Sequence, residues 1–286
     1  MPATNPQKSS GFSQMTSTIQ TADFDGHRVD VLVPDSLSPT TPLLLIHDGM
    51  NVFFEEYASS GDTWQIRELI AAKRIHGAPL VAAIWGEGGT QKYNPRRINE
   101  FLCDDFFARE PQQWQTLVPV LRPPTQEHRG NYFLDLVAEQ IVPAIASSFG
   151  IEVSPRRTAL VGCSVAGVAS IYWMMKRPDV FGATISLSSH WEFGAEPLID
   201  FLVDGLGAPT DRLIWSDSGT EGFDAVSLPL NGYFAERMRA SGEWVTGINL
   251  ETPTFWGADH HETAWARRVE HPINWWLQSL PPENES

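Results

Sequence analysis

The chain has little cysteine, no excess of basic residues and no long hydrophobic run. Its 286 residues include two cysteines, Cys103 and Cys163, which excludes a disulfide framework and indicates a reducing compartment. The formal net charge of −15 argues against a nucleic-acid or anionic-membrane partner. No hydrophobic run approaches the ~20 residues that span a bilayer, and residues 1–20 lack the hydrophobic core of a signal peptide. We therefore expect a cytoplasmic protein that binds neither nucleic acid nor a membrane.

No internal repeat or linker divides the chain, so we expect a disordered leader (1–20), one domain (21–280) and a tail (281–286). Short hydrophobic runs alternate with longer helical patterns. Strands are expected at 28–33, 43–47, 80–85, 158–161, 183–187, 213–216 and 247–255, and helices at 63–76, 133–149, 165–176, 230–240 and 262–279. Several strands are hydrophobic throughout, which predicts an α/β fold with a mostly parallel central sheet flanked by helices.

Two local features of the sequence add detail to the predicted fold. Asp62 followed by Gln65 is typical of an N-terminal cap and predicts where the first helix begins. The stretch 87–130 is polar and contains paired prolines and scattered aromatic residues, so we expect an insertion over the top of the sheet. Such an insertion is either a lid or binding element, or a variable surface excursion.

Ser164 lies where a hydrophobic strand gives way to a helix, in the run Gly162-Cys-Ser-Val-Ala-Gly167. A sharp turn at this point lifts a serine hydroxyl above the edge of the sheet and aims the next backbone N–H, that of Val165, at a developing oxyanion. The usual nucleophile turn has glycine two residues after the serine, whereas this chain has Ala166 there and glycine one place later. The alternative is a plain glycine-containing turn with an incidental serine.

A serine nucleophile needs a general base and an acid that orients the base. The segment after the last strand contains His260 and His261, and neighbouring residues in an extended loop point in different directions, so at most one reaches Ser164. A metal site built from Asp259 and these two histidines is disfavoured because adjacent residues rarely ligate one ion. We therefore expect no metal and no organic cofactor.

The acid is expected in the loop after the strand at 213–216, because sheet-topped hydrolases follow the chain order serine, acid, histidine. Asp217, Glu221 and Asp224 all lie there and all have suitable chemistry, so the choice between them stays open. The second oxyanion donor is expected in the loop after an earlier strand. Asp48-Gly49-Met50 fits, since Gly49 lets the backbone turn close to the substrate and brings the N–H of Met50 forward.

Together these segments resemble the putative-esterase branch of the α/β-hydrolase superfamily, which includes enterochelin esterases, S-formylglutathione hydrolases, feruloyl esterases and mycolyltransferases. The resemblance rests on the segments 47–51, 162–167, 217–225 and 257–265 and on the helix start around Trp64. It implies that Ser164 is the nucleophile, that His260 rather than His261 is the base, and that Met50 and Val165 donate to the oxyanion. For the acid it favours Asp224, with Glu221 next.

The resemblance also implies a serine hydrolase that cleaves a small-molecule carboxylic ester through an acyl-enzyme intermediate, with an oligomeric state left open. Asp48, Trp64 and Trp191, with parts of the insertion, are expected to border the substrate pocket. One alternative is an acyltransferase that resolves the same acyl-enzyme with an alcohol. The other is a catalytically silent protein that uses the hydrolase fold for binding, because fold alone does not settle function.

Overall fold

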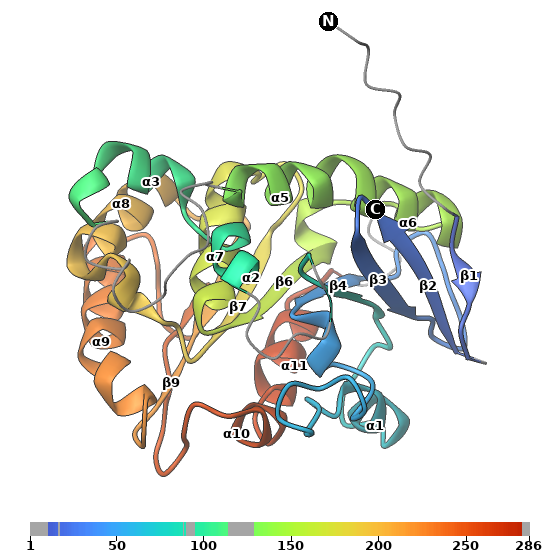
Figure 1. Cartoon of the computed structure of the whole chain (residues 1–286). Helices are drawn as coiled ribbons and strands as arrows, with labels where there is room; N and C mark the ends of the chain where they lie inside the picture. The colour runs from blue at the N-terminus through green and yellow to red at the C-terminus, as the bar shows by residue number, and fades with distance from the viewer. Residues whose placement is uncertain (1–10, 17, 88, 90–94, 114–128, 282–286) are drawn as a thin grey trace, which may run out of the picture.

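A nine-stranded sheet forms the centre of the computed structural model, which describes residues 11–16, 18–87, 89, 95–113 and 129–281 (Figure 1). The strands lie in the order β1-β2-β3-β5-β4-β6-β7-β8-β10. Pairs from β5 to β10 are parallel, and β1, β2 and β3 pair antiparallel. Their bounds are β1 Ser13–Gln14, β2 Ile19–Phe24, β3 His27–Leu32, β4 Leu43–His47, β5 Leu80–Ile84, β6 Thr158–Cys163, β7 Ala183–Leu187, β8 Leu213–Ser216 and β10 Leu250–Glu251.

Helices cover both faces of this sheet, with α5, α6 and α7 on one face and α1 and α11 on the other (Figure 1). The α-helices are α1 Ile66–Ala71, α2 Pro95–Glu100, α3 Asp104–Arg109, α5 Gly130–Leu136, α6 Val142–Phe149, α7 Val165–Lys176, α8 Ala195–Leu206, α9 Asp224–Ala240, α10 Glu262–Ala266 and α11 Glu270–Gln278. Short helical segments are η1 Gly49–Asn51, η2 Val137–Ile141, η3 Pro155–Arg157 and η4 Trp191–Phe193.

Strand β4 shows why the central strands are hydrophobic throughout. Leu43 and Leu45 belong to the core beneath α5 to α7, whereas Leu44 and Ile46 belong to the core beneath α1 and α11. Because alternate residues of a strand face opposite sides of the sheet, burying both faces requires hydrophobic residues at every position. The predicted α/β fold with a mostly parallel sheet flanked by helices is therefore confirmed.

Most predicted elements are found close to their expected bounds. The bounds of β4, β7, β8 and α7 are confirmed as predicted. The helix expected at 133–149 is found as an uninterrupted run of α5, η2 and α6, with a π-helical segment at η2 and a start at Gly130. The helix expected at 230–240 begins earlier, at Asp224, with Pro229 inside it.

Three further predicted elements have the wrong bounds. The helix expected at 63–76 begins at Ile66, after Gln65 in a left-handed conformation, and Asp62 caps nothing. Trp64 instead donates its backbone N–H to Asn51, which ties the chain to η1 before the helix starts. The strand expected at 247–255 divides into β10 and β11 (Thr254–Phe255), and β11 pairs with β9 (Ser218–Gly219) in a separate sheet. The helix expected at 262–279 divides into α10 and α11.

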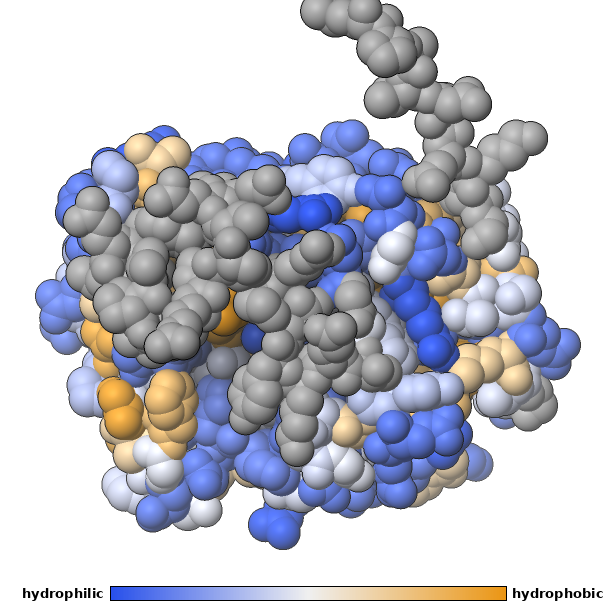
Figure 2. All heavy atoms as spheres, viewed as in Figure 1, coloured by the Kyte–Doolittle hydropathy of each residue, from blue (hydrophilic) through white to orange (hydrophobic). Residues whose placement is uncertain are grey.

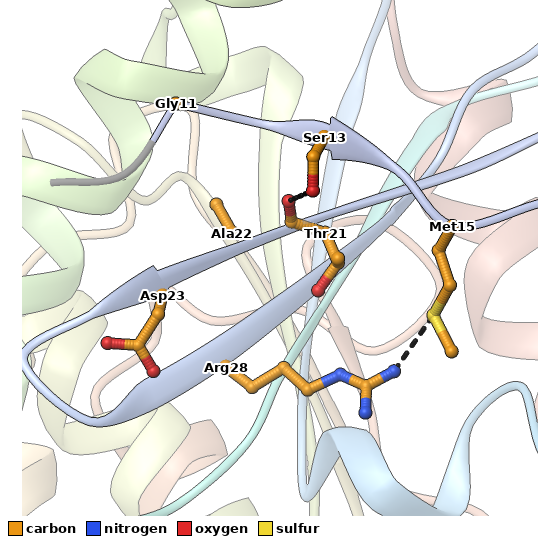
Figure 3. A pocket seen from close by; sticks show the side chains of 7 residues that line it. All are labelled: Gly11, Ser13, Met15, Thr21, Ala22, Asp23 and Arg28. Carbon is orange, nitrogen blue, oxygen red and sulfur yellow. Dashed lines mark hydrogen bonds between the residues drawn. The ribbon is translucent and has the colours of Figure 1, made fainter.

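The expected disordered leader at 1–20 is also wrong in part, although residues 1–10 lie outside the described residues. Ser13 pairs with Thr21 in β2, so this polar segment forms β1 at the edge of the sheet. An edge strand has a neighbouring strand on one side and leaves its other side to solvent. A pocket lies beside this edge, and its wall includes Arg28, which donates a hydrogen bond to Met15 (Figure 3). Its lining residues are Gly11, Ser13, Met15, Thr21, Ala22, Asp23 and Arg28.

Candidate active site

Ser164 occupies the turn between β6 and α7 in a conformation that non-glycine residues rarely adopt. Its φ is 59° and its ψ is −127°. The turn is held on both sides, because Ser164 donates its backbone N–H to the carbonyl of Leu187 (2.9 Å) and accepts from the backbone N–H of His190 (3.2 Å). A strained residue persists only where its surroundings impose the conformation, and here the end of β7 does so. The geometry is that of the sharp strand-to-helix turn expected from the sequence.

Two glycines explain how the helix fits so tightly behind this turn. A Cβ on Gly162 would lie 2.3 Å from the carbonyl oxygen of Ala166, and a Cβ on Gly167 would lie 2.4 Å from Oγ of Ser186. Both contacts are far shorter than real Cβ atoms make, so α7 can approach β6 and β7 only with glycine at both places. Helix α7 therefore approaches β7 most closely at residue 167, where glycine is required. An alanine is accommodated one residue earlier, at position 166.

His260 and Asp224 form a direct pair in the loops that follow the last strands. His260 Nδ1 lies 2.7 Å from Asp224 Oδ1, with the carboxylate 1% exposed. The ring of His260 is enclosed by Trp265 and Phe223, at centroid distances of 5.1 and 5.4 Å. His261, with a side chain 46% exposed, instead contacts Thr263 at the start of α10. The structure thus brings together one of the two adjacent histidines with one of the three acids.

Asp224 stays ionised because of the donors around it. Burial acts to raise the pKa of this carboxyl, but hydrogen bonds from His260, Ser188 and the backbone N–H of Gly219 lower it below its usual value. Ser188 Oγ lies 2.6 Å and Gly219 N lies 2.7 Å from Oδ2. An ionised carboxylate of this kind orients an imidazole through Nδ1–H and stabilises the imidazolium that forms.

The other two acids are placed differently. Asp217 is fully buried and forms an ion pair with Arg268, whose Nη2 lies 2.9 Å from Oδ1. Glu221 is exposed on the loop before α9. Neither is hydrogen-bonded to His260 in the described part of the chain.

The two backbone N–H groups expected as oxyanion donors lie at the ends of neighbouring parallel strands. Ile46 of β4 pairs with Val161 of β6, so η1 begins beside the turn that carries Ser164. Among the described residues, none accepts a hydrogen bond from the backbone N–H of Met50 or Val165. A Cβ on Gly49 would lie 2.3 Å from Cδ1 of Trp85, so only glycine permits the chain to turn there.

Asp48 adopts a left-handed conformation at the start of η1 and is tied to the region expected as an insertion. Arg97 of α2 donates to both carboxylate oxygens, with Nη2 2.6 Å from Oδ2. The Sγ of Cys163 also lies 3.9 Å from Oδ2. Within the 87–130 region, helix α2 therefore contacts the loop that carries Met50 directly.

Removing the arginine tests how firmly this contact holds the loop. Arg97→Met leaves the buried Asp48 carboxylate without its partner, and we expect the free energy of unfolding to fall by about 3 kcal/mol. The matched control is Arg67→Met, whose pair with Glu68 on α1 is exposed and whose loss should cost about 0.5 kcal/mol or less. Equal unfolding midpoints in urea for the two variants would contradict the assignment.

The tryptophans expected at the pocket are both buried in this structure. Trp64 packs against Trp265 with ring centroids 5.9 Å apart, and Trp191 stacks on Phe234 at 4.8 Å. Neither presents a surface to a ligand in this conformation.

Two aromatic residues that the sequence analysis did not assign to the site lie beside His260. The ring of His190 is 6.4 Å from that of His260, and Phe223 stacks on His190 at 4.8 Å. Phe223 is 49% exposed, and Val226 one turn along α9 is 61% exposed. Figure 2 shows hydrophobic surface over β9 and the start of α9, toward the lower left of the view. No local sequence pattern indicated these two residues, because their position beside His260 depends on how the loop after β7 folds onto Ser164.

The described residues include no cluster of three or more histidine, cysteine or acidic side chains that could hold a metal ion. Among the helices that the structure describes, none combines the length and hydropathy needed to cross a membrane.

Comparison with solved structures shows the same fold. The enterobactin esterase of Shigella flexneri superposes with a TM-score of 0.61 at 16% identity, over 89% of this chain and 56% of the esterase. The BES protein of Bacillus cereus gives 0.63 at 13% identity, over 96% and 99% of the two chains. The siderophore hydrolase EstA of Aspergillus nidulans gives 0.57 at 17% identity, over 87% and 90%. At such identities the likeness shows the fold alone.

Sequence similarity assigns the chain to a protein family. The chain is 27% identical over 100 residues to the uncharacterized protein YbbA of Bacillus subtilis strain 168, which is 35% of this chain and 39% of YbbA. It therefore spans only part of the length of that relative and of the Shigella esterase. Residues 105–272, more than half of the chain, match the family described as "Putative esterase". The chain belongs to this family of putative esterases.

Proposed function

We propose that the protein hydrolyses a carboxylic ester through an acyl-enzyme, with Ser164 as nucleophile, His260 as general base and Asp224 as the acid that orients the base. The observation that carries this proposal is the 2.7 Å pair of His260 and Asp224 in a chain of the esterase family whose strained turn presents Ser164. The three residues also follow the chain order serine, acid, histidine that this fold uses.

In the structure without substrate, the proposed hydrogen bond between Ser164 and His260 is not formed. Among the described residues, Ser164 Oγ has no hydrogen bond with His260, and Nε2 of His260 has no partner. Catalytic hydrogen bonds are often long in the absence of substrate and tighten in the bound complex. His190 links Ser164 and His260. It donates its backbone N–H to Ser164, and its ring lies beside the ring of His260.

The chemistry then proceeds in two steps. Ser164 Oγ attacks the ester carbonyl while His260 Nε2 takes its proton, and the same proton passes to the departing alkoxide. The N–H groups of Met50 and Val165 bind the oxyanion, each contributing about 3 kcal/mol to the transition state. Water activated by His260 then cleaves the acyl-enzyme and restores Ser164.

The surroundings of His260 support a small ester with a hydrophobic portion as substrate. The exposed Phe223 and the ring of His190 form a hydrophobic side to the site. The structural neighbours named as acting on enterobactin, ferulic acid esters and siderophores support ester hydrolysis as the reaction class. Assaying p-nitrophenyl esters of increasing acyl length tests this, with added alcohols to detect acyl transfer in place of hydrolysis.

Replacing the acid separates Asp224 from the neighbouring carboxylates. Asp224→Asn keeps the size of the side chain but removes the charge that orients His260, so we expect kcat for p-nitrophenyl acetate to fall about 10⁴-fold. Glu221→Gln, an equivalent change on the exposed loop, should leave kcat within a factor of about two because surface changes of this kind have small effects. Near-normal turnover by Asp224→Asn would place the acid elsewhere.

A further inference from the structure

A buried polar network lies on the side of Asp224 away from His260, and Ser188 is at its centre. Ser188 follows β7 and is 1% exposed. Its Oγ lies 2.6 Å from Asp224 Oδ2, 2.9 Å from Trp265 Nε1 and 2.7 Å from Arg268 Nη2. Trp265 and Arg268 belong to the segment just after His260, so the network joins the two loops that carry the acid and the base.

These three contacts fix the direction of the hydroxyl proton. The indole of Trp265 and the guanidinium of Arg268 can only donate, so they occupy the two lone pairs of Ser188 Oγ. The single O–H of Ser188 must therefore donate to Asp224. Ser188 Oγ thus accepts from Trp265 and from the cationic Arg268, and donates its own proton to the Asp224 carboxylate.

Arg268 pairs more closely with a second acid, Asp217, than with Asp224. Its Nη2 lies 2.9 Å from Asp217 Oδ1 but 3.9 Å from Asp224 Oδ2. Asp217 also accepts from the backbone N–H of Ser188 (3.1 Å) and from Trp215 Nε1 (3.0 Å). Asp217 therefore takes the closer ion pair, and Arg268 reaches Asp224 both over this longer distance and through the Ser188 hydroxyl.

The backbone at Ser188 is held in a conformation that serine seldom adopts. Its φ is 47°, in the left-handed region. The bond from its N–H to Asp217 holds the residue there, with its hydroxyl toward Asp224. Residues strained in this way cluster at functional sites, so the conformation directs attention to the contacts of the Ser188 hydroxyl.

We propose that Ser188 is a positioning residue that holds Asp224 ionised and oriented toward His260, and that Arg268 and Asp217 set the direction of its hydroxyl. The proposal rests on the proposed function, because it concerns the acid of the same site. Ser188 does not touch the substrate.

Losing the hydroxyl has a predictable effect on the pH dependence. Hydrogen bonds to Asp224 lower the pKa of its carboxyl, so removing one raises that pKa and protonates the acid at a higher pH. The loss of activity that follows protonation of Asp224, on the acid side of the profile, therefore occurs at a higher pH. Among the described residues, the charged and titratable groups in contact with Asp224, His260 or their direct partners include Arg268, Asp217, Asp259, His190 and Glu192, and all are retained in the variant.

The test compares Ser188→Ala with Ser189→Ala. Both serines are 1% exposed, but within the described part of the chain Ser189 Oγ is hydrogen-bonded only to the hydroxyls of Ser186 and Ser216. For Ser188→Ala we expect kcat to fall about tenfold, since a hydrogen bond to a charged group is lost, with KM unchanged. We also expect the loss of kcat/KM that follows protonation of Asp224 to move to higher pH. Ser189→Ala should keep the pH profile of the wild-type protein.

A second variant guards against misfolding. Ser188→Gly removes the same hydroxyl and relieves the left-handed backbone, so it should fold and show the same loss and the same pH displacement. Equal kcat and an unmoved acid side in both Ser188 variants would overturn the proposal. So would the same changes in Ser189→Ala. Failure of the proposed function is distinguishable, because Ser164→Ala would then retain activity whatever the Ser188 variants do.

Discussion

Replacing Ser164 with alanine is expected to lower kcat for p-nitrophenyl acetate by about 10⁵- to 10⁶-fold, the scale seen when a serine nucleophile is removed from a triad. The hydroxyl is the atom that bonds to the ester carbonyl, and nothing else at the turn replaces it. Steady-state release of p-nitrophenol measures the effect, with enzyme concentrations high enough to follow the residual rate.

The stability of the variant serves as the control. Alanine at φ 59° is strained as serine is, and Ser164 Oγ has no hydrogen-bond partner among the described residues, so removing it breaks no such contact. We expect the thermal midpoint of Ser164→Ala to match that of the wild-type protein. Turnover within a factor of about ten of wild type would show that Ser164 is not the nucleophile, since that loss is far below the nucleophile scale.

The second large effect separates the adjacent histidines. His260→Ala removes the group paired with Asp224 and should lower kcat by about 10⁵-fold or more, because the serine then has no base. His261→Ala alters a side chain that is 46% exposed and contacts Thr263, and kcat should stay within a factor of about three, as for surface changes. Kinetics of the two variants at one pH measure this ranking.

The control for this pair is the folded state of each variant. His261 accepts from the backbone N–H of Thr263 at the start of α10, so its loss should cost about 1 kcal/mol of stability as a lost cap. The reverse ranking, with His261→Ala the more damaging to turnover, would contradict the choice of base. Comparing kcat with the unfolding midpoint keeps the two effects apart.

The features that the sequence predicted well are those set by local pattern. Strand β4 and helix α7 have the expected bounds because their hydrophobic and small residues act over a few positions. The turn at Ser164 is similar, since Gly162 and Gly167 permit the close packing that the turn requires. A polar edge strand such as β1 was missed because its pairing with β2 leaves no hydrophobic pattern.

The parts of the site that could not be predicted depend on pairs of side chains far apart in the chain. Asp48 is separated from Arg97 by 49 residues and Ser188 from Asp224 by 36. Each bond forms only when loops from different strands meet at one edge of the sheet. The sequence alone does not distinguish the several carboxylates of one loop, such as Asp217, Glu221 and Asp224. The family resemblance favoured Asp224 and His260, and the structure places these two within hydrogen-bond distance.

The most direct test of the central claim is to treat the full chain with a fluorophosphonate and map the adduct by peptide mass spectrometry. Our account predicts one adduct per chain, on Ser164, which is absent from Ser164→Ala and forms much more slowly in His260→Ala because the serine is no longer activated. An adduct on another residue in the wild-type protein, or undiminished labelling of Ser164→Ala, would contradict it.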